Sequence, residues 1–293
     1  ASSTRQTCRM ILTISTTLIR RFLFMNTITH SASPFESHPA AAVIGRELQA
    51  AILSRYLQVF GVLALAGGVG AALLANTADA AAMFILQMAL YFVSLFALLI
   101  GTSSARAESQ EWPLLFAQPI ARSTFLLGKF IALSLIFAGL MLLLFLPALF
   151  VGASGGRFVS LYGRTLALAA TFVALGLSAG FLARDRVQGI VAGVSAWLVC
   201  LFGLDLIALI AAHWPFLQAV PDAWTTLLML NPLDAFRIDA LFALERVPAE
   251  AAGQATLTSW WLAHTGLWFV LISIAWMVAL LGMTAKRLAR WEE

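Results

Sequence analysis

The chain has 293 residues, of which 61% are hydrophobic and only 11% are charged, and its formal net charge is +4. Soluble domains average about 45–50% apolar and about 25% charged residues, so this composition excludes a soluble enzyme, a disordered scaffold and a secreted disulfide framework. The apolar runs are continuous rather than alternating, which excludes a membrane β-barrel. The sequence therefore predicts an all-α polytopic membrane protein. We interpret the positive charge as basic cytoplasmic loops rather than a nucleic-acid surface.

The first 40 residues form an N-terminal extension that we expect to be disordered. Residues 1–24 are rich in Ser, Thr and Arg and contain no acidic residue. We interpret Met25 as the natural start and residues 1–24 as an upstream extension; the alternative is a targeting segment. The membrane domain would then comprise residues 41–293.

An amphipathic helix is predicted between Ala41 and Tyr56, directly before the first long apolar run. Apolar residues recur at every fourth position from Ile44 onward, and polar residues fill the positions between them. A helix of this kind lies at the membrane interface, so we expect an N-terminal interfacial helix here.

Six runs are apolar and long enough to cross a bilayer, which takes about 20 residues of helix. They comprise residues 57–75, 80–101, 130–152, 165–183, 190–212 and 263–283. With the N-terminus inside, the external loops hold four of the 18 Lys and Arg residues: Arg157, Arg164, Arg237 and Arg246. Because cytoplasmic loops are enriched in Lys and Arg, this asymmetry predicts six transmembrane helices with both termini in the cytoplasm.

The cytoplasmic loop 102–129 contains signals for a short helix. Proline is tolerated in the first turn of a helix and acidic residues favour its N-terminus, so Glu111 and Pro113 predict a helix start. Pro119 ends the helix, since the residue before a proline avoids the α conformation. The apolar face of this helix, Leu114, Leu115 and Phe116, must be covered. Either the bilayer and neighbouring helix ends or a partner protein could cover it.

This loop resembles the signature of type-2 ABC exporter permeases. The residues that carry the resemblance are Glu111, Leu114, Leu115, Pro119, Arg122, Leu127, Gly128 and Lys129. Trp112-Pro113 departs from the Gly-Thr pair of many family members, and Gly45–Leu48 resembles the family's interfacial helix. The resemblance covers the chain from about residue 42, and it implies a cytoplasmic helix that docks on an ATPase subunit. The docking residues it implies are Glu108, Glu111, Leu114, Leu115, Phe116, Pro119 and Arg122.

The external connection 213–262 contains a second helix signal. Asn231 can cap a helix, Pro232 suits its first position and Asp234 its first turn. With the apolar stretch before it, this predicts a re-entrant helical segment near the outer surface; the alternative is an ordinary interfacial helix. Residues 230–237 resemble the Leu-Asn-Pro-x-Asp-x-Phe-Arg stretch of the permeases that serve nitrous oxide reductase maturation. The residues expected to dock a periplasmic partner are Trp224, Asn231, Asp234, Phe236 and Arg237.

The resemblance further implies a homodimer in the lipid of the bacterial inner membrane, cytoplasmic ABC ATPase subunits and a periplasmic accessory protein serving copper-site assembly. We expect no catalytic residues and no cofactor in this chain, with ATP and Mg bound by the ATPase partner. The chain has no Gly-Lys-Ser phosphate loop, so it should not hydrolyse ATP itself. The alternatives are export of a lipid, drug or haem-related molecule, a membrane-embedded enzyme, and a membrane anchor.

Other residues carry weaker signals. An acid inside a membrane span is costly, so Asp205 predicts either a functional site, a structural pair or a side chain that reaches the outer surface. His213 and His264, with Met229 or Met283, lack ligand spacing, so no metal site is predicted. Two Gly-x-x-x-Gly motifs, at Gly176 and Gly189, permit close helix packing. Packing within the chain is the favoured interpretation, and a dimer interface is the alternative.

Overall fold

The computed structural model describes residues 44–49, 54–107, 122–150, 155–211, 228–244 and 264–290. The expected extension 1–40 and the expected docking helix at 111–118 lie outside these residues. All the described residues belong to one compact unit, Val43–Glu293.

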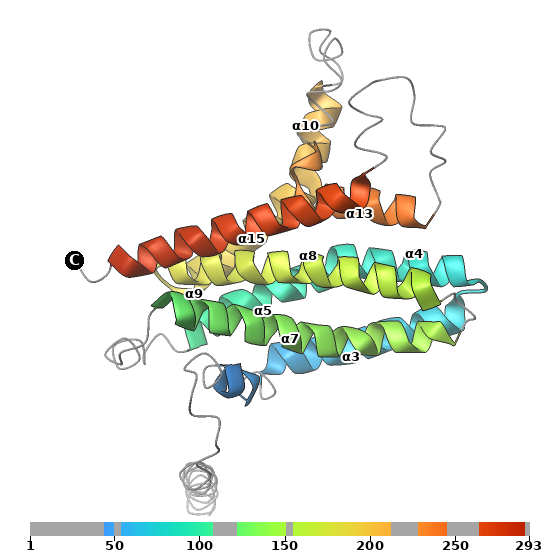
Figure 1. The fold of residues 1–293 in the computed structure, drawn as a ribbon, viewed down its shortest axis with the longest axis horizontal. Helices are drawn as coiled ribbons and strands as arrows, with labels where there is room; N and C mark the ends of the chain where they lie inside the picture. Colours follow the sequence, from blue (N-terminus) through green and yellow to red (C-terminus); the bar gives the residue numbers. More distant parts are fainter. Residues whose placement is uncertain are drawn as a thin grey trace, which may run out of the picture. The chain divides into compact units, whose positions relative to one another are not determined.

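Every regular element in the described part of the chain is a helix (Figure 1). Residues 44–49 are helical. The labelled helices are α3 (Arg55–Leu74), α4 (Ala78–Met88), α5 (Ser94–Ala107), α7 (Arg122–Leu149), α8 (Gly155–Leu182), α9 (Arg186–Leu198), α10 (Leu204–Ala211), α13 (Pro232–Ala243) and α15 (Thr265–Ala289). Two π-helical segments, η1 (Ala89–Val93) and η2 (Val199–Gly203), join α4 to α5 and α9 to α10.

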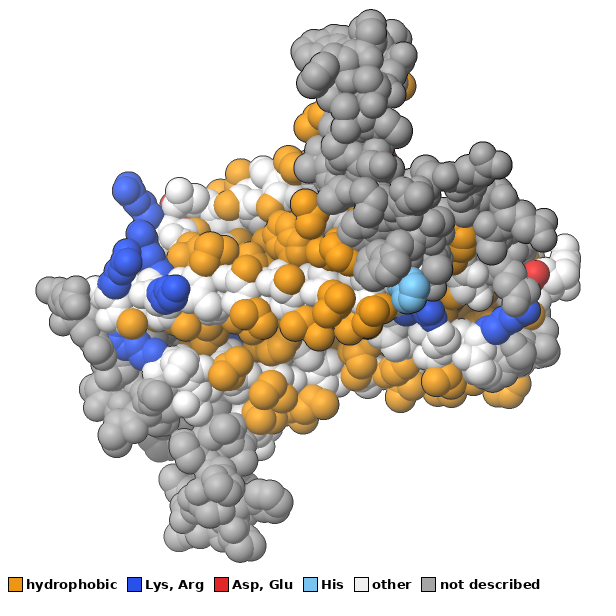
Figure 2. Space-filling model, turned by 45° about the horizontal axis from the view of Figure 1, so that its top comes forward, with side chains coloured by type: hydrophobic (Ala, Val, Ile, Leu, Met, Phe, Trp, Pro, Cys, Tyr) orange, Lys and Arg blue, Asp and Glu red, His pale blue; other side chains and the backbone are white. Residues whose placement is uncertain are grey.

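Six of the described helical stretches are long and apolar enough to cross a membrane. They are Arg55–Leu74, Ala78–Ala107, Arg122–Leu149, Gly156–Leu182, Arg186–Ile207 and Thr265–Ala289. Each overlaps one of the six predicted runs, so the prediction of an all-α polytopic membrane protein is confirmed. On the face drawn in Figure 2, hydrophobic side chains cover the middle, and most Lys and Arg side chains lie toward the ends.

Two helices begin earlier than the hydrophobic runs predict. α7 begins at Arg122 rather than near residue 130, and α8 begins at Gly155 rather than near residue 165. The added turns contain polar side chains that find partners inside the bundle. The hydroxyl of Tyr162, for example, donates to the Ala138 carbonyl at 2.7 Å.

The breaks between the helices follow the capping signals of the sequence. The side chain of Thr77 accepts a hydrogen bond from the Ala80 amide at the start of α4. Asp185 accepts one from the Gln188 amide at the start of α9. Such N-caps bind amide groups that the first turn of a helix leaves without partners.

α5 and α8 form the closest contact of the bundle because glycines face it. A Cβ at Gly176 would lie 2.2 Å from the Leu98 carbonyl oxygen, and one at Gly101 would lie 2.7 Å from the Val173 carbonyl oxygen. Gly193, on α9, faces the Leu98 side chain from another direction. The glycine motifs therefore pack within the chain, as the sequence analysis favoured.

Candidate functional sites at the two ends of the helix bundle

The bundle has two ends that carry polar clusters. At one end α5 ends and α7 begins, on either side of residues 108–121; we call it the α7 end. At the other end α13 packs on the first turns of α15 and α8; we call it the α13 end.

A buried ion pair lies at the α7 end. The Lys129 ammonium is 2.6 Å from a carboxylate oxygen of Glu47, and the two side chains are 1% and 4% exposed. The Ser104 hydroxyl donates to the other carboxylate oxygen of Glu47 at 3.3 Å. The Glu47 carboxylate thus contacts α5, which ends before residues 108–121, and α7, which follows them.

This pair corrects the expected orientation of the N-terminal helix. The sequence pattern placed Glu47 on the polar face and Leu48 on the apolar face. In the structure Glu47 is 3% exposed and Leu48 is 37% exposed. Lys129 lies seven residues after the start of α7, roughly 10 Å along the helix, so Glu47 satisfies a charge inside the bundle, and Leu48 is left exposed on the other face.

Arg122 makes a second link at this end. Its guanidinium donates to the carbonyl oxygen of Leu288, in the last turn of α15. The last carbonyls of a helix lack intrahelical donors and carry partial negative charge, so an arginine there is favourable. Arg122 is the one expected docking residue among the described residues, and this contact directs it toward α15. The other six lie outside the described residues, and ATPase docking remains a prediction.

At the α13 end, the predicted helix start is confirmed. Asn231 accepts a hydrogen bond from the Leu233 amide at 3.2 Å, and Pro232 occupies the first position of α13. Phe236 is fully buried against Phe269 of α15, with ring centroids 5.7 Å apart. The expected re-entrant path before α13 falls on residues 212–227, outside the described part of the chain.

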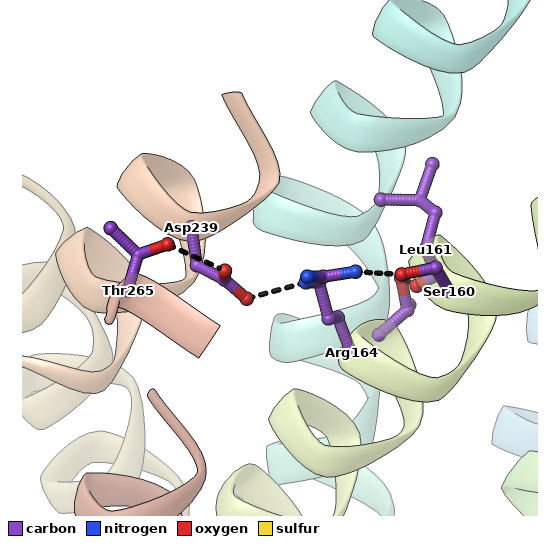
Figure 3. Close-up of polar contacts among 6 residues, drawn as sticks. Ser160, Leu161, Arg164, Asp239 and Thr265 are labelled. Atoms are coloured by element: carbon purple, nitrogen blue, oxygen red, sulfur yellow. Dashed lines mark hydrogen bonds and ion pairs between the residues drawn. The ribbon is translucent and has the colours of Figure 1, made fainter. Parts of the chain in front are cut away.

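Arg164 and Asp239 form the most buried ion pair at this end (Figure 3). The Arg164 Nε is 2.5 Å from the Asp239 carboxylate, which is 1% exposed. The hydroxyl of Thr265 donates to the second Asp239 oxygen at 3.1 Å, and Arg164 also donates to Ser160. The cluster joins α13 to α8 and α15. The sequence analysis did not predict this cluster. The sequence offered one indication of it: Asp239 is a charged residue on the otherwise apolar face of the helix.

Two tryptophans of α15 hold the residues before α13. Trp268 Nε1 donates to the Met229 carbonyl at 2.8 Å, and Trp276 Nε1 donates to the Leu230 carbonyl at 3.0 Å. These are backbone contacts, so they fix the entry to α13 whatever the side chains of Met229 and Leu230.

α13 also contacts the C-terminal part of the fifth span. Asn231 Nδ2 donates to the Cys200 carbonyl and to the Asp234 carboxylate, both at 2.5 Å. The Arg237 guanidinium lies 3.9 Å from the Asp205 carboxylate, with the side chains 55% and 51% exposed. The partner of Asp205 therefore comes from α13 rather than from another span, in line with the structural-pair alternative.

Asp234 titrates in an unusual range. The pKa of its carboxyl is raised from the ordinary 3.8 to about 6, chiefly by burial; the hydrogen bond from Asn231 and the charge of Arg237 lower it, and the charge of Asp205 adds to the rise. A carboxyl with this pKa changes charge at mildly acidic pH.

The sequence is similar to that of a named transporter protein. No family model matches the chain. A Pseudomonas aeruginosa protein named "Probable ABC transporter permease protein NosY" is 29% identical over 238 residues, which cover 74% of this chain and 84% of that protein. The sequence is therefore similar to that of a protein named as an ABC transporter permease, and this agrees with the resemblance to ABC permeases stated from the sequence.

At the α13 end, the residues expected to dock an external partner differ in how exposed they are. Asn231 and Phe236 are 3% and 0% exposed and are engaged within the chain. The Arg237 side chain is half exposed, and Trp224 lies outside the described residues. In this conformation a partner could reach Arg237 but not Phe236. The docking role itself remains a prediction.

No cluster of metal-ligating side chains is found among the described residues. Within the ranges that the structure describes, no three His, Cys, Asp or Glu side chains gather as ligands. His264 precedes the first residue of α15, and Met229 contributes its carbonyl to Trp268. The buried ion pairs of the two ends, Lys129 with Glu47 and Arg164 with Asp239, link helices.

Proposed function

We propose that this chain is the membrane-spanning permease subunit of an ABC exporter, and that it works as a homodimer with separate ATPase subunits. The observation that carries the proposal is the similarity to an ABC permease over 84% of that relative's length. Six candidate spans and a cytoplasmic loop with the permease signature agree with it.

The α7 end suggests how such a subunit would be driven. ATP-driven closure of the ATPases would move residues 108–121, which join α5 to α7. Glu47 holds these two helices through Ser104 and Lys129, and Arg122 holds α15. A displacement of the docking segment would therefore reach several spans together. In this scheme nucleotide biases two arrangements of one bundle.

Copurification of the permease with its ATPase tests the proposal. Leu115→Asp would bury a charge in the ATPase groove, which costs several kcal/mol unless the groove opens, so we expect loss of the complex or of coupled ATP hydrolysis. Val187→Asp is the matched control, because Val187 is 70% exposed near the start of α9. An unchanged complex with normal coupling in Leu115→Asp would refute the docking assignment. Failure of any ATPase to copurify would favour an enzyme or an anchor.

The basic residues support a topology with both termini in the cytoplasm, in the bacterial inner membrane. Lys286 and Arg287 lie in the last turn of α15 and would anchor the C-terminus inside. An alkaline phosphatase fused after residue 293 should be inactive in intact cells. Periplasmic activity of that fusion would reverse the topology.

The likeness of residues 230–237 supports a more specific role, copper-site maturation of nitrous oxide reductase with a periplasmic accessory protein. We expect that protein to bind the 213–262 connection, and Trp224→Ala to weaken binding more than Arg237→Ala, because tryptophans dominate many interfaces and Asp205 already holds Arg237. Copurification of the protein encoded beside the permease measures this. Undiminished binding after replacement of residues 245–258 by a Gly/Ser linker together with Trp224→Ala would refute the docking site, and the connection would then be only a structural lid over the outer mouth.

A further inference from the structure

The fifth span is interrupted by a π-helical segment. η2 occupies five residues between α9 and α10, within the membrane-spanning stretch Arg186–Ile207. A π segment departs from the α-helical hydrogen-bond pattern and is a common cause of sharp kinks. Figure 1 shows α10 turned away from the direction in which α8 and α15 run.

The inner half of this span is fixed to the second span. Gly193 of α9 faces the side chain of Leu98 at close range. Trp197 Nε1 donates to the hydroxyl of Ser94 at 2.9 Å, and both residues are buried. By contrast, none of the residues of η2 is buried, and Leu206 and Leu209 of α10 are 58% and 63% exposed. The packing of the span thus changes at η2.

α13 contacts the span at two points, one within η2 and one beyond it, in α10. Asn231 Nδ2 donates to the carbonyl of Cys200 within η2, at 2.5 Å. Within a bilayer, backbone groups released by a helix distortion need partners from neighbouring elements, and this amide supplies one. One turn further on, Arg237 meets Asp205 at 3.9 Å. That pair is half exposed, so it is a weak contact.

The contacts that attach α13 to α8 and α15 are more numerous and more buried than those between α13 and the fifth span. The buried pair of Asp239 with Arg164, the Thr265 hydroxyl and the burial of Phe236 against Phe269 attach it to α8 and α15. Two tryptophan hydrogen bonds to the preceding carbonyls add to this attachment. Separation of α10 from α13 therefore requires fewer and weaker contacts to break than separation of α13 from the bundle.

We infer that α13 is a fixed platform that latches the outer part of the fifth span through Asn231 and Arg237, and that η2 is the hinge at which α10 leaves it. Asn231 is the positioning residue of the latch: its oxygen caps α13, and its amide nitrogen holds the Cys200 carbonyl. The latch is inferred from the contacts of Asn231 and Arg237 with the fifth span. Movement of α10 away from α13 during transport rests on the proposed function.

The variant Asn231→Ser tests the latch in the full-length permease in lipid nanodiscs. Serine is as good an N-cap as asparagine, so α13 should stay intact, but its hydroxyl cannot reach the Cys200 carbonyl while it caps. Hydrogen exchange by mass spectrometry should then accelerate at residues 204–211 by about five- to tenfold, the effect of one hydrogen bond of ordinary strength. Exchange at residues 232–243 should not change.

Two further variants separate the latch from a general loss of stability. Thr77→Ala removes an N-cap hydrogen bond from α4 without touching the fifth span, so it should leave exchange at 204–211 unchanged. Asp205→Asn should accelerate exchange in the same direction as Asn231→Ser, by a smaller factor. Unchanged exchange at 204–211 in Asn231→Ser, or equal loosening of 204–211 and 232–243, would overturn the latch.

The opening is tested in the complex with the ATPase. Trapping the ATPases with ATP and vanadate should accelerate exchange at 204–211 relative to the nucleotide-free complex, and leave 232–243 protected. An unchanged or slower exchange at 204–211 would overturn the opening. If no ATPase forms a complex with the permease, the proposed function fails, but the variants in the isolated permease still decide whether the latch exists.

Discussion

The carboxylate of Glu47 lies 2.6 Å from the ammonium of Lys129, across 82 positions of sequence, with both side chains buried. Lys129 also lies 5.4 Å from the ring centre of Phe125, one turn earlier in α7. Neither charge could be buried at this depth alone, because desolvation of a single ion costs more than several hydrogen bonds return. The pair therefore fixes the N-terminal helix to the start of α7.

The first prediction concerns this pair. Lys129→Met should lower the free energy of unfolding by about 3–5 kcal/mol, since it leaves the buried Glu47 carboxylate without its cation. The double variant Glu47→Gln with Lys129→Met should recover much of that loss. Thermal unfolding of the detergent-solubilised permease measures both. Lys286→Met, at an exposed position near the end of α15, is the control. A double variant less stable than Lys129→Met would contradict the account.

The sequence was sufficient for the features that depend on neighbours along the chain. Each span is a run of about 20 apolar residues, and bilayer thickness alone sets that length. The start of α13 at Pro232 followed from the capping preference of Asn231, which acts within one turn. Gly176 signalled a close helix contact, because helix approach needs a small residue whatever the partner.

The features that depend on distant neighbours could not be predicted in this way. The sequence placed Glu47 on a solvated face because its partner, Lys129, belongs to another helix. It placed Arg237 beside an external partner because nothing local indicates that Asp205 of the fifth span lies 3.9 Å away. The apolar runs also place the starts of α7 and α8 too late, because hydrophobicity alone cannot show that polar side chains such as Tyr162 find partners inside the bundle.

The second prediction concerns the α5–α8 contact. Gly176→Ala should destabilise the permease by several kcal/mol, on the order of the larger overpacking penalties, because its Cβ would lie 2.2 Å from a backbone carbonyl that cannot move by itself. Gly139→Ala is the matched control: it lies in α7 with no atom within 4 Å of the added Cβ, and alanine favours the helix by up to about 1 kcal/mol. The melting temperatures should therefore shift in opposite directions. A similar shift in both variants would contradict the predicted close contact.

The third prediction compares two arginines of α8. Arg164→Met leaves the Asp239 carboxylate buried without its cation, so it should cost about 3–5 kcal/mol of stability and detach α13. Arg157→Met breaks a pair with Asp79 at 3.6 Å whose side chains are 45% and 48% exposed, and should cost about 0–1 kcal/mol. Thermal unfolding gives the two costs, and limited proteolysis of residues 245–263 reports the attachment of α13. An equal loss of unfolding free energy in both variants would contradict the view that the burial of Asp239 strengthens its pair with Arg164.

The last prediction concerns pH and Asp234. Because burial raises the pKa of this carboxyl to about 6 in the folded protein from an ordinary 3.8, the folded state binds the proton more tightly than the unfolded state between those values. The contribution to stability is therefore full below about pH 4 and is lost as the pH rises to about 6, by at most about 3 kcal/mol. Asp234→Asn has no titrating proton at this position, so the difference in unfolding free energy between wild type and variant should change with pH from 4.5 to 6.5 and then level off. Thermal unfolding over that range measures it, and Asp79→Asn, which removes a half-exposed carboxylate at the same end, should leave the wild-type slope in place. A constant difference between wild type and Asp234→Asn would mean that Asp234 is ionised in the folded protein throughout, and that its bond to Asn231 outweighs burial.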